Sequence, residues 1–257
     1  MVNKELVKQR FEKNLSTYTQ NAVVQKHMAS ELIASLTAHV GGIAIPPYTN
    51  NFNKILEIGC GTGTLTNEIL NQINFEELFA NDIVENSLSS EILSDKIKKL
   101  YGDCEKIQFP SNLDLVISNA TFQWLENLPA VLNKIHSSLN EGAIIAFNTF
   151  EEWNLYQIKT LTGSALNYYK KSEIENILSK NFKIIYSNSE TIEIEFNCAQ
   201  DVLKHLKLTG VNSLKPTKWT KKNLKEFGDK YNLLFKNDKG KLILTYKPLY
   251  FICTKQQ

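Results

Sequence analysis

Short apolar runs alternate with amphipathic segments through the middle of the chain. The runs KILEI, ELFAN, LDLVISN and GAIIAFNTF have the length and composition of strands, and KKLYG is a weaker run between the second and the third. Helical spacing of apolar positions marks the intervening segments 62–73, 86–97 and 128–139. Five strands that alternate with helices predict an α/β fold with a parallel, doubly wound sheet. Ligands bind such a sheet at the edge where the carboxyl ends of its strands meet.

The pattern changes after the fifth strand. Ser172 and Glu175 have capping-box spacing, which predicts a helix over SEIENILSKN. The stretch FKIIYSNSETIEIEF alternates like a strand or a hairpin, and KLILTYKPLYFICTK predicts a strand at the end of the chain. Residues 199–235 between them are mostly helical, with breaks at Gly210 and Pro216.

The first forty residues are also set apart from the alternating part. Residues 4–38 have helical spacing without glycine or proline, and the breaker-rich stretch GGIAIPPYTNN follows as a linker. We therefore predict a single domain over residues 1–257, made of an N-terminal helical cap (1–40), a Rossmann-like core (41–196 and 241–257) and a helical lid (197–240) inserted before the last strand.

Composition narrows the class of protein. Hydrophobic residues make up 42% and charged residues 22% of the 257, as in an ordinary protein with a packed core. No apolar run approaches a membrane span, the N-terminus has no apolar targeting segment, and the net charge of +2 does not indicate nucleic acid. The four cysteines are scattered without metal-ligand spacing, so we expect no metal site and a cytoplasmic location. Arg10 is the only arginine, so few guanidinium contacts to an anion are available.

A glycine loop follows the first predicted strand. Gly59, Gly61 and Gly63 have the spacing G-x-G-x-G, which lets backbone approach a ligand closely. A dinucleotide fingerprint would place its third glycine at Thr64. A P-loop would need Lys followed by Ser or Thr after the last glycine. The loop therefore matches neither nucleotide motif.

Three acidic residues accompany this loop. Glu57 lies two residues before Gly59, Asp82 ends the second strand, and Asp103 follows the third. A carboxylate at the end of the second strand can accept both hydroxyls of a ribose, and one on the next strand suits an adenine amine. The pattern therefore favours one nucleoside that carries an amino-acid tail.

The motifs LEIGCGTG, ND, GD, DLVISNA and LNEGAIIAF, in this order, resemble the seven-stranded S-adenosylmethionine-dependent methyltransferases. The resemblance implies a Rossmann-like sheet of seven strands with the last strand antiparallel. It also implies S-adenosylmethionine as cofactor and S-adenosylhomocysteine as product, with the glycine loop on the methionine part, Asp82 on the ribose and Asp103 on the adenine. The cofactor-binding residues that it implies are Arg10, Glu57, Gly59, Gly61, Gly63, Asp82, Ile83, Asp103, Cys104 and Asn119.

The stretch SNATFQWLENL follows the fourth strand, where the methyl group of the cofactor would lie. Methyltransferases that act on base amines have an Asn/Asp-Pro-Pro-aromatic motif here, and this chain lacks both prolines. An exocyclic amine is therefore disfavoured as acceptor. Phe122 and Trp124 either form an apolar wall against substrate and sulfonium or pack against the following helix.

Four further blocks, RFEKNLSTYTQNAVVQKHM, ISNATFQWLENL, LKHLKLTGVNS and LTYKPLYFICTK, resemble the malonyl-[acyl-carrier-protein] O-methyltransferases of biotin synthesis. This likeness runs from about residue 3 to 255, although segment 153–169 matches poorly and Asn81 departs from the usual small or apolar residue. It implies methyl transfer to the free carboxylate of malonyl-acyl carrier protein. A carboxylate is ionised at neutral pH and needs no general base, so the enzyme needs mainly alignment, exclusion of water and an anchor for the anion.

Candidate anchors come from opposite ends of the chain. We expect Tyr18 and Lys207 to act in catalysis, with Phe122, Trp124 and Lys207 on the substrate, while Arg10 holds either that carboxylate or the cofactor's own. Residues 202–225 hold seven lysines and no acid, which suits an acidic partner such as acyl carrier protein rather than nucleic acid or membrane. Two alternatives remain open: a methyltransferase for a small free carboxylic acid of the aconitate type, and a non-catalytic cofactor- or RNA-binding module.

Overall fold

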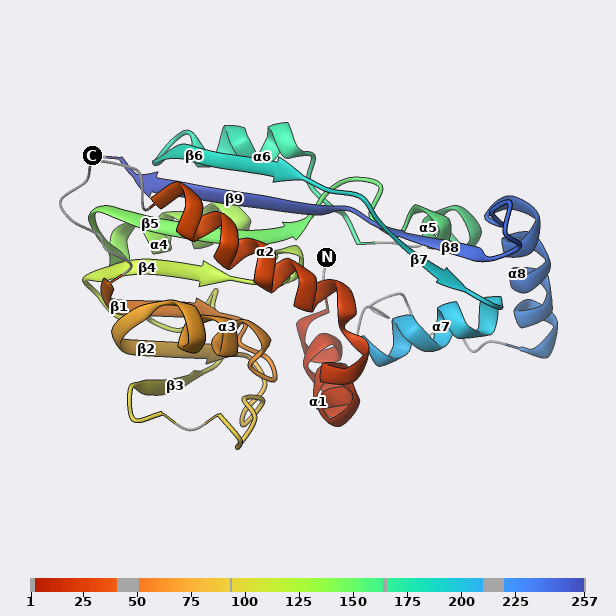
Figure 1. Cartoon of the computed structure of the whole chain (residues 1–257), viewed down its shortest axis with the longest axis horizontal. Coiled ribbons are helices and arrows are strands. Elements are labelled where there is room, and N and C mark those ends of the chain that lie inside the picture. The colour runs from red at the N-terminus through yellow and green to blue at the C-terminus, as the bar shows by residue number, and fades with distance from the viewer. Residues whose placement is uncertain (1–2, 41–50, 93, 164–165, 210–219, 257) are drawn as a thin grey trace.

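A seven-stranded mixed sheet forms the body of the molecule (Figure 1). The computed structural model describes residues 3–40, 51–92, 94–163, 166–209 and 220–256. The predicted linker residues 41–50 and the predicted breaks at Gly210 and Pro216 lie outside these ranges. In the order β3-β2-β1-β4-β5-β9-β6, the strands are Ile97–Tyr101, Asn74–Asp82, Asn51–Ile58, Leu113–Ser118, Leu139–Phe150, Pro248–Lys255 and Phe182–Ser189.

Strand directions place the carboxyl ends of β1 to β5 at one edge of the sheet. These five strands pair in parallel, and β9 runs antiparallel to both β5 and β6. The chain order reverses between β1 and β4, which is where doubly wound sheets bind ligands. The predicted Rossmann-like sheet with an antiparallel last strand is therefore confirmed.

Helices cover both faces of this sheet. α2 (Val23–Val40) and α3 (Thr64–Gln72) pack on one face, and α4 (Leu128–Ser138) and α6 (Lys171–Leu178) pack on the other. Strand β5 shows why both faces need a cover, because Ile145 and Phe147 point into one core while Ile144 and Ala146 point into the other. A run that is apolar at every position is typical of such a doubly covered strand.

The N-terminal cap consists of two helices. α1 (Lys4–Asn21) begins at Asn3, whose side chain accepts a hydrogen bond from the Leu6 amide, and α2 starts again after Ala22. α1 lies at the edge where the parallel strands end, beside α7 (Ala199–Leu208), as Figure 1 shows. The predicted helical segment 4–38 is thus confirmed, with one break.

The helices of the predicted lid range (197–240) lie beside a second, smaller sheet whose strands fall within the ranges predicted for the core. β7 (Ile192–Phe196) pairs antiparallel with β8 (Leu242–Tyr246), beside α5 (Tyr156–Thr162), α7 and α8 (Lys221–Leu234). These elements share a core in which Val202 and Leu206 of α7 are buried, as the apolar face predicted for that helix requires. The hairpin considered for residues 182–196 does not form, because β6 pairs with β9 while β7 turns away to pair with β8.

Two predictions of local structure are wrong. The helix expected over 86–97 is replaced by turns and the start of β3, because Asn86 adopts a φ of +57° and the hydroxyls of Ser89 and Ser94 accept backbone N–H groups two residues on. The capping box expected at Ser172 and Glu175 lies two residues earlier: α6 starts after Lys170, whose amide donates to Glu173 Oε2 at 2.7 Å. No helix within the described ranges is long and apolar enough to cross a membrane.

Candidate active site

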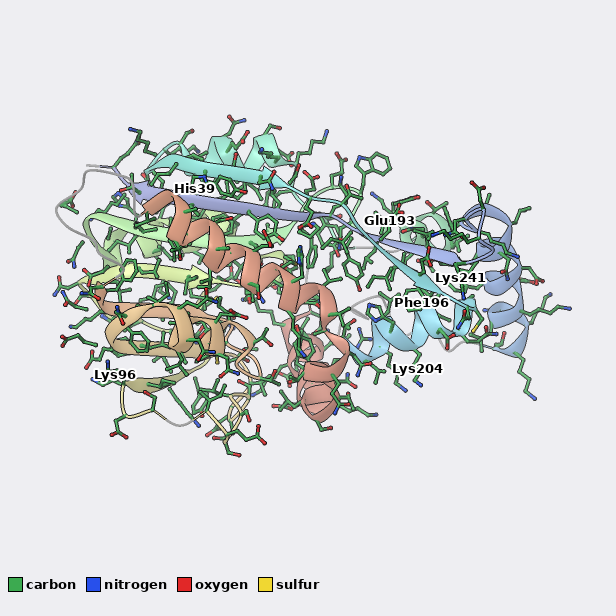
Figure 2. The ribbon with its side chains drawn as sticks, viewed as in Figure 1. His39, Lys96, Glu193, Phe196, Lys204 and Lys241 are labelled. Carbon is green, nitrogen blue, oxygen red and sulfur yellow. The ribbon has the colours of Figure 1, made fainter. Side chains whose placement is uncertain are left out.

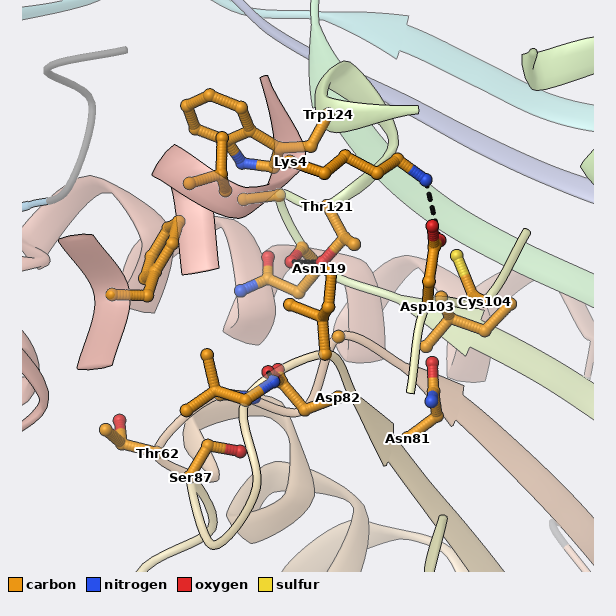
Figure 3. Close-up of a pocket in the computed structure, with 18 of the residues that line it drawn as sticks. Lys4, Thr62, Asn81, Asp82, Ser87, Asp103, Cys104, Asn119, Thr121 and Trp124 are labelled. Atoms are coloured by element: carbon orange, nitrogen blue, oxygen red, sulfur yellow. Dashed lines mark hydrogen bonds and ion pairs between the residues drawn. The ribbon is translucent and has the colours of Figure 1, made fainter. Parts of the chain in front are cut away.

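A pocket with an empty volume of about 840 Å³, which includes open solvent, lies at the carboxyl ends of β1 to β4. Five of its lining residues come from α1, and the others come from the ends of β1 and β2 and from the segments that follow β1 to β4. The helical cap therefore forms one wall of the pocket, and the edge of the sheet forms the opposite wall. Figure 3 shows Asp82, Asp103, Asn119 and Trp124 gathered around this pocket.

The glycine loop turns from β1 into α3 in a backbone conformation that side chains disfavour. The φ angles are +78° at Gly59, +50° at Gly61 and +95° at Gly63, all in the left-handed region. A Cβ on Gly59 would lie 2.0 Å from Thr121 Oγ1, so the loop after β4 packs directly on bare backbone. The glycines therefore serve the local turn as well as the approach of a ligand.

Asp82 at the end of β2 holds this loop in place. Its Oδ2 accepts from the Gly61 amide at 2.8 Å and its Oδ1 accepts from the Val84 amide at 2.8 Å. Burial raises the pKa of this carboxyl, while the backbone amides act in the opposite direction. Each carboxylate oxygen has a further lone pair, so Asp82 can accept hydroxyl hydrogens from a ligand without losing these bonds.

Glu57 lies one layer deeper, with no solvent exposure. Its Oε2 accepts from the Thr66 hydroxyl at 2.7 Å, and its Oε1 has no hydrogen-bond donor among the described residues. Burial, together with the charge of Asp82, raises the pKa of Glu57 to about 7, although the hydrogen bond from Thr66 opposes this. Glu57 and Asp82 thus place two carboxyl groups in one buried region, where a negative charge on one disfavours ionisation of the other.

Lys4 reaches from α1 across the pocket to the loop after β3. Its ammonium contacts Asp103 Oδ1 at 2.6 Å (Figure 3) and also pairs with Glu105. Burial acts to lower the pKa of Lys4, but the two carboxylates more than offset it and the pKa is raised. This ion pair fastens the helical cap over the residue predicted to bind adenine.

Buried amides shape the loop after β4. Asn148 accepts from the Ala120 amide at 2.7 Å and donates to the Met28 carbonyl at 2.9 Å, which links this loop to α2. Ala120 has a φ of +49° there. Asn119 donates to the Gln25 carbonyl at 3.1 Å, while its buried Oδ1 has no donor within the described part of the chain. Since Asn119 lines the pocket, a ligand ammonium could supply that donor.

A second cavity of about 310 Å³ adjoins the first, and the two share Phe11, Tyr18, Ala120 and Trp124. The rings of Phe11 and Tyr18 have centroids 5.6 Å apart, and those of Phe11 and Trp124 6.0 Å apart. These aromatic residues therefore form the boundary between the cavities. Burial, with a smaller effect of Asp82, raises the pKa of Tyr18, so its hydroxyl stays protonated and can donate.

The structure brings most of the predicted site residues together, with five exceptions. Those that line the first pocket are Tyr18, Gly59, Gly61, Asp82, Ile83, Asp103, Cys104, Asn119 and Trp124. Among the exceptions, Glu57 and Gly63 lie behind the loop, and Arg10 is a partly exposed residue of α1. Phe122 is buried with its ring 4.7 Å from that of Phe147, which favours the packing role that the sequence left open. Lys207 is exposed on α7 and lines neither cavity.

Cysteine and histidine provide no nucleophile or base here. Burial raises the pKa of both Cys60 and Cys104, the latter to about 12, so both thiols are neutral. His205 on α7 is within 2.8 Å of the Tyr246 hydroxyl, and burial lowers its pKa to about 4. No cluster of potential metal ligands occurs among the residues that the structure describes.

Sequence reasoning missed Lys4, Phe11, Tyr168 and Tyr246, which reach the cavities from distant parts of the chain. Position in α1 was the only available signal for Lys4 and Phe11, since both share that helix with Tyr18. Tyr246 lies within the block LTYKPLYFICTK, which did not mark it as a site residue, and Tyr168 had no signal, because the placement of both depends on how distant segments fold back on the sheet edge.

The first pocket fits S-adenosylmethionine. Asp82 has lone pairs for the ribose, Asp103 retains an oxygen for the adenine amine, and Asn119 Oδ1 can accept from the ammonium of the methionine part. The remaining wall is largely apolar, including Ile83 and Trp124. When bound, the cofactor supplies a sulfonium-activated methyl group.

Comparisons with known proteins agree with this description. Residues 56–147 match the family model described as a methyltransferase domain. The chain is 38% identical to the malonyl-[acyl-carrier protein] O-methyltransferase of Calditerrivibrio nitroreducens over 97% of this chain and 96% of that protein. It is 35% identical to the protein of the same name from Chlorobium luteolum, over 100% and 97% of the two chains. A putative methyltransferase from Bacillus halodurans has the same fold, with a TM-score of 0.62 at 14% identity, over 88% of this chain and 99% of that one.

Fold and site together define a Rossmann-like, S-adenosylmethionine-dependent methyltransferase. The extent of the sequence match makes the assignment narrower. The chain belongs to the malonyl-[acyl-carrier protein] O-methyltransferase family.

Proposed function

We propose that this enzyme transfers the methyl group of S-adenosylmethionine to the free carboxylate of a malonyl group on acyl carrier protein, and that the resulting ester primes pimeloyl synthesis for biotin. Membership of the family supports the substrate. The observation that carries the proposal is the second cavity, which adjoins the cofactor pocket across Tyr18 and has no charged residue among its described lining. This described lining provides no cation for the phosphate groups of a nucleic acid.

The reaction needs no proton transfer. A carboxylate oxygen of the acceptor attacks the methyl carbon, the carbon–sulfur bond breaks, and its electron pair returns to sulfur. An anion and a sulfonium cation are neutralised together, so exclusion of water and alignment lower the barrier. The aromatic boundary formed by Phe11, Tyr18 and Trp124 serves both purposes.

Tyr18 is the proposed catalytic donor. Its hydroxyl lies in the wall common to both cavities and can hydrogen-bond one carboxylate oxygen while the other attacks. A neutral donor suits this task, because a strong positive charge would stabilise the reactant carboxylate more than the transition state. Lys207 is exposed and lies outside both cavities, so we propose that it contacts the carrier protein and not the malonyl carboxylate.

The carrier protein is proposed to dock on α7 and the start of α8. Lys204, Lys207, Lys221, Lys222 and Lys225 are exposed there. Figure 2 shows Lys204 beside the sheet of β7 and β8, whereas Lys96 lies at the opposite end of the molecule. Acyl carrier proteins are acidic, so this surface would steer association through charge. The other two lysines of the run, Lys215 and Lys218, lie outside the described residues.

A methyl-transfer assay with labelled cofactor tests the acceptor. We expect label on malonyl-acyl carrier protein and none on free malonate or aconitate. Label on a free diacid alone would favour a small-molecule methyltransferase, and oligonucleotide binding that falls steeply with salt, without any methyl transfer, would favour an RNA-binding module.

Variants test the two proposed roles. Tyr18→Phe should lower turnover roughly tenfold to a thousandfold with nearly unchanged cofactor affinity, as expected for one lost oriented hydrogen bond. Tyr186→Phe on β6 is the matched control, because it lines neither cavity. Single-turnover methylation by Tyr18→Phe at the wild-type rate would remove Tyr18 from the reaction.

The lysine surface is tested by charge reversal. The double variant Lys204→Glu/Lys207→Glu should slow association with the carrier protein and flatten its salt dependence, and cofactor affinity should stay the same. Lys99→Glu/Lys183→Glu, on exposed positions of β3 and β6, is the matched control. Equal salt dependence in the two double variants would place the docking surface elsewhere.

A further inference from the structure

Segment 151–169 carries a buried polar group that the reaction described so far does not use. Asn154, just before α5, lines the second cavity and is only 2% exposed. Its Oδ1 accepts from the Lys247 amide at 2.9 Å, so the orientation of the side-chain amide is determined. Its Nδ2 is buried and makes no hydrogen bond of good geometry to the residues that the structure describes, although the side-chain amide interacts with the Tyr168 hydroxyl. A buried donor without an acceptor costs stability, so its presence in a cavity wall calls for a ligand.

The backbone around Asn154 is held in an unfavourable conformation. Trp153 and Leu155 flank it with φ angles of +74° and +54°, values that residues other than glycine rarely adopt. The Leu155 amide donates to the Thr245 carbonyl at 2.9 Å, which fastens the turn to β8. Strain of this kind persists where the surroundings enforce it, and it is concentrated at functional sites. The turn therefore presents the Asn154 amide to the cavity at an energetic cost.

Tyr168 provides a second donor beside Asn154. Both line the second cavity, and burial raises the pKa of Tyr168 to about 12, while a hydrogen bond with the Asn154 side chain acts in the opposite direction. The hydroxyl is thus protonated at neutral pH. Two neutral donors lie together here, and no cationic side chain occurs in the described lining of the cavity.

We propose that Asn154 Nδ2 and the Tyr168 hydroxyl bind the acceptor carboxylate in the second cavity, and that this donor pair selects a carboxylate as the methyl acceptor. The inference rests on the proposed function, since it takes a carboxylate as the group that enters this cavity. Neutral donors orient the anion towards the cofactor pocket without the desolvation cost of a buried cation. Tyr18, in the wall that separates the cavities, then contacts the oxygen nearer the methyl group.

Two substitutions separate binding from folding. Asn154→Asp keeps an oxygen for the Lys247 amide but replaces the donor by an acceptor, so kcat/KM for malonyl-acyl carrier protein should fall at least about a hundredfold at pH 8. Tyr168→Phe removes one donor and should lower kcat/KM roughly tenfold, mainly through KM. The affinity for S-adenosylhomocysteine, measured by calorimetry, should stay within about twofold in both variants. Asn167→Asp and Tyr169→Phe are matched controls at neighbouring positions that line neither cavity.

The outcomes are distinct. Loss of methylation with unchanged affinity for S-adenosylhomocysteine supports the proposed donor pair. A kcat/KM close to the wild-type value in both variants overturns it. If Asn154→Asp fails to bind S-adenosylhomocysteine because it does not fold, Tyr168→Phe alone decides. If the wild-type enzyme does not methylate malonyl-acyl carrier protein, the proposed function is wrong, and the inference that rests on it is wrong as well.

Discussion

Glu57→Gln should change how the stability of the cofactor-free enzyme depends on pH. The Glu57 carboxyl is fully buried, and its pKa is raised from 4.5 to about 7 by burial and by Asp82. The folded protein therefore holds this proton more tightly than the unfolded chain does. The contribution of the protonated Glu57 carboxyl to the free energy of unfolding is fully present below pH 4.5 and is lost as the pH rises through about 7.

The size of the effect follows from the two pKa values. One pKa unit is worth about 1.4 kcal/mol, so ionisation of Glu57 costs the folded state about 3 kcal/mol in total. Between pH 5 and pH 8 the loss is roughly 2 to 3 kcal/mol, because a small part has already occurred at pH 5. Glutamine does not titrate, so the stability of Glu57→Gln relative to wild type should rise by this amount over the same interval. The amide can still accept from the Thr66 hydroxyl, and any cost of its NH₂ group is independent of pH.

Urea unfolding of both proteins at pH 5, 6, 7 and 8 measures this double difference directly. Titrating groups that do not interact with Glu57 cancel, because they are common to both proteins, whereas the titration of Asp82 remains part of the difference because its charge acts on Glu57. Glu76→Gln, at an exposed position on β2, controls for the change in net charge. A wild-type-to-variant difference that stays within about 0.5 kcal/mol across the four pH values, the typical error of such comparisons, would refute the raised pKa of Glu57.

Three further predictions concern the pocket. Gly59→Ala should destabilise the protein by about 2 kcal/mol or more and weaken cofactor binding, because its Cβ would lie 2.0 Å from Thr121 Oγ1. The added variant Thr121→Ala should recover only part of the lost melting temperature, because the strain of a φ of +78° remains. Asp82→Ala should weaken cofactor binding by about 1.5–3 kcal/mol or more in calorimetry, and unchanged affinity would exclude Asp82 from the site. Lys4→Gln should release S-adenosylhomocysteine about fivefold faster in stopped-flow measurements, because an ion pair of about 1 kcal/mol no longer fastens α1; an unchanged rate would show that α1 closes without it.

Local patterns in the sequence were sufficient to predict most of the strands and helices of the core. The strands β1, β2, β4 and β5 follow apolar runs, and α4 follows its buried positions Leu128, Val131, Leu132 and Ile135. Such patterns are reliable because burial of one face or both faces acts on residues that are close in the chain. The expected helix over 86–97 failed because serine and asparagine side chains bond to the backbone more favourably there than a helix would.

Motifs in the sequence also located the candidate cofactor pocket, because its glycines and acidic residues lie at or just after the ends of strands of one parallel sheet. The direction of those strands brings Gly59, Asp82 and Asp103 to the same edge without any detail of packing. Spacing alone could not show that Phe122 turns into the core while Trp124 faces the pocket, since both positions lie on one short turn of η1 (Phe122–Trp124).

Only the tertiary structure determined the cavity that we propose for the acceptor. Lys4 meets Asp103 across 99 positions of sequence, and Tyr18, Asn154, Tyr168 and Tyr246 surround one cavity from four separate segments. The helical pattern of α7 correctly identified its buried face, but it could not show that Lys207 points away from that cavity. An amphipathic pattern says which side of an element is covered. Which segment covers it depends on long-range pairing, here of β7 with β8 and of β6 with β9, and that pairing is decided by the packing of the whole chain.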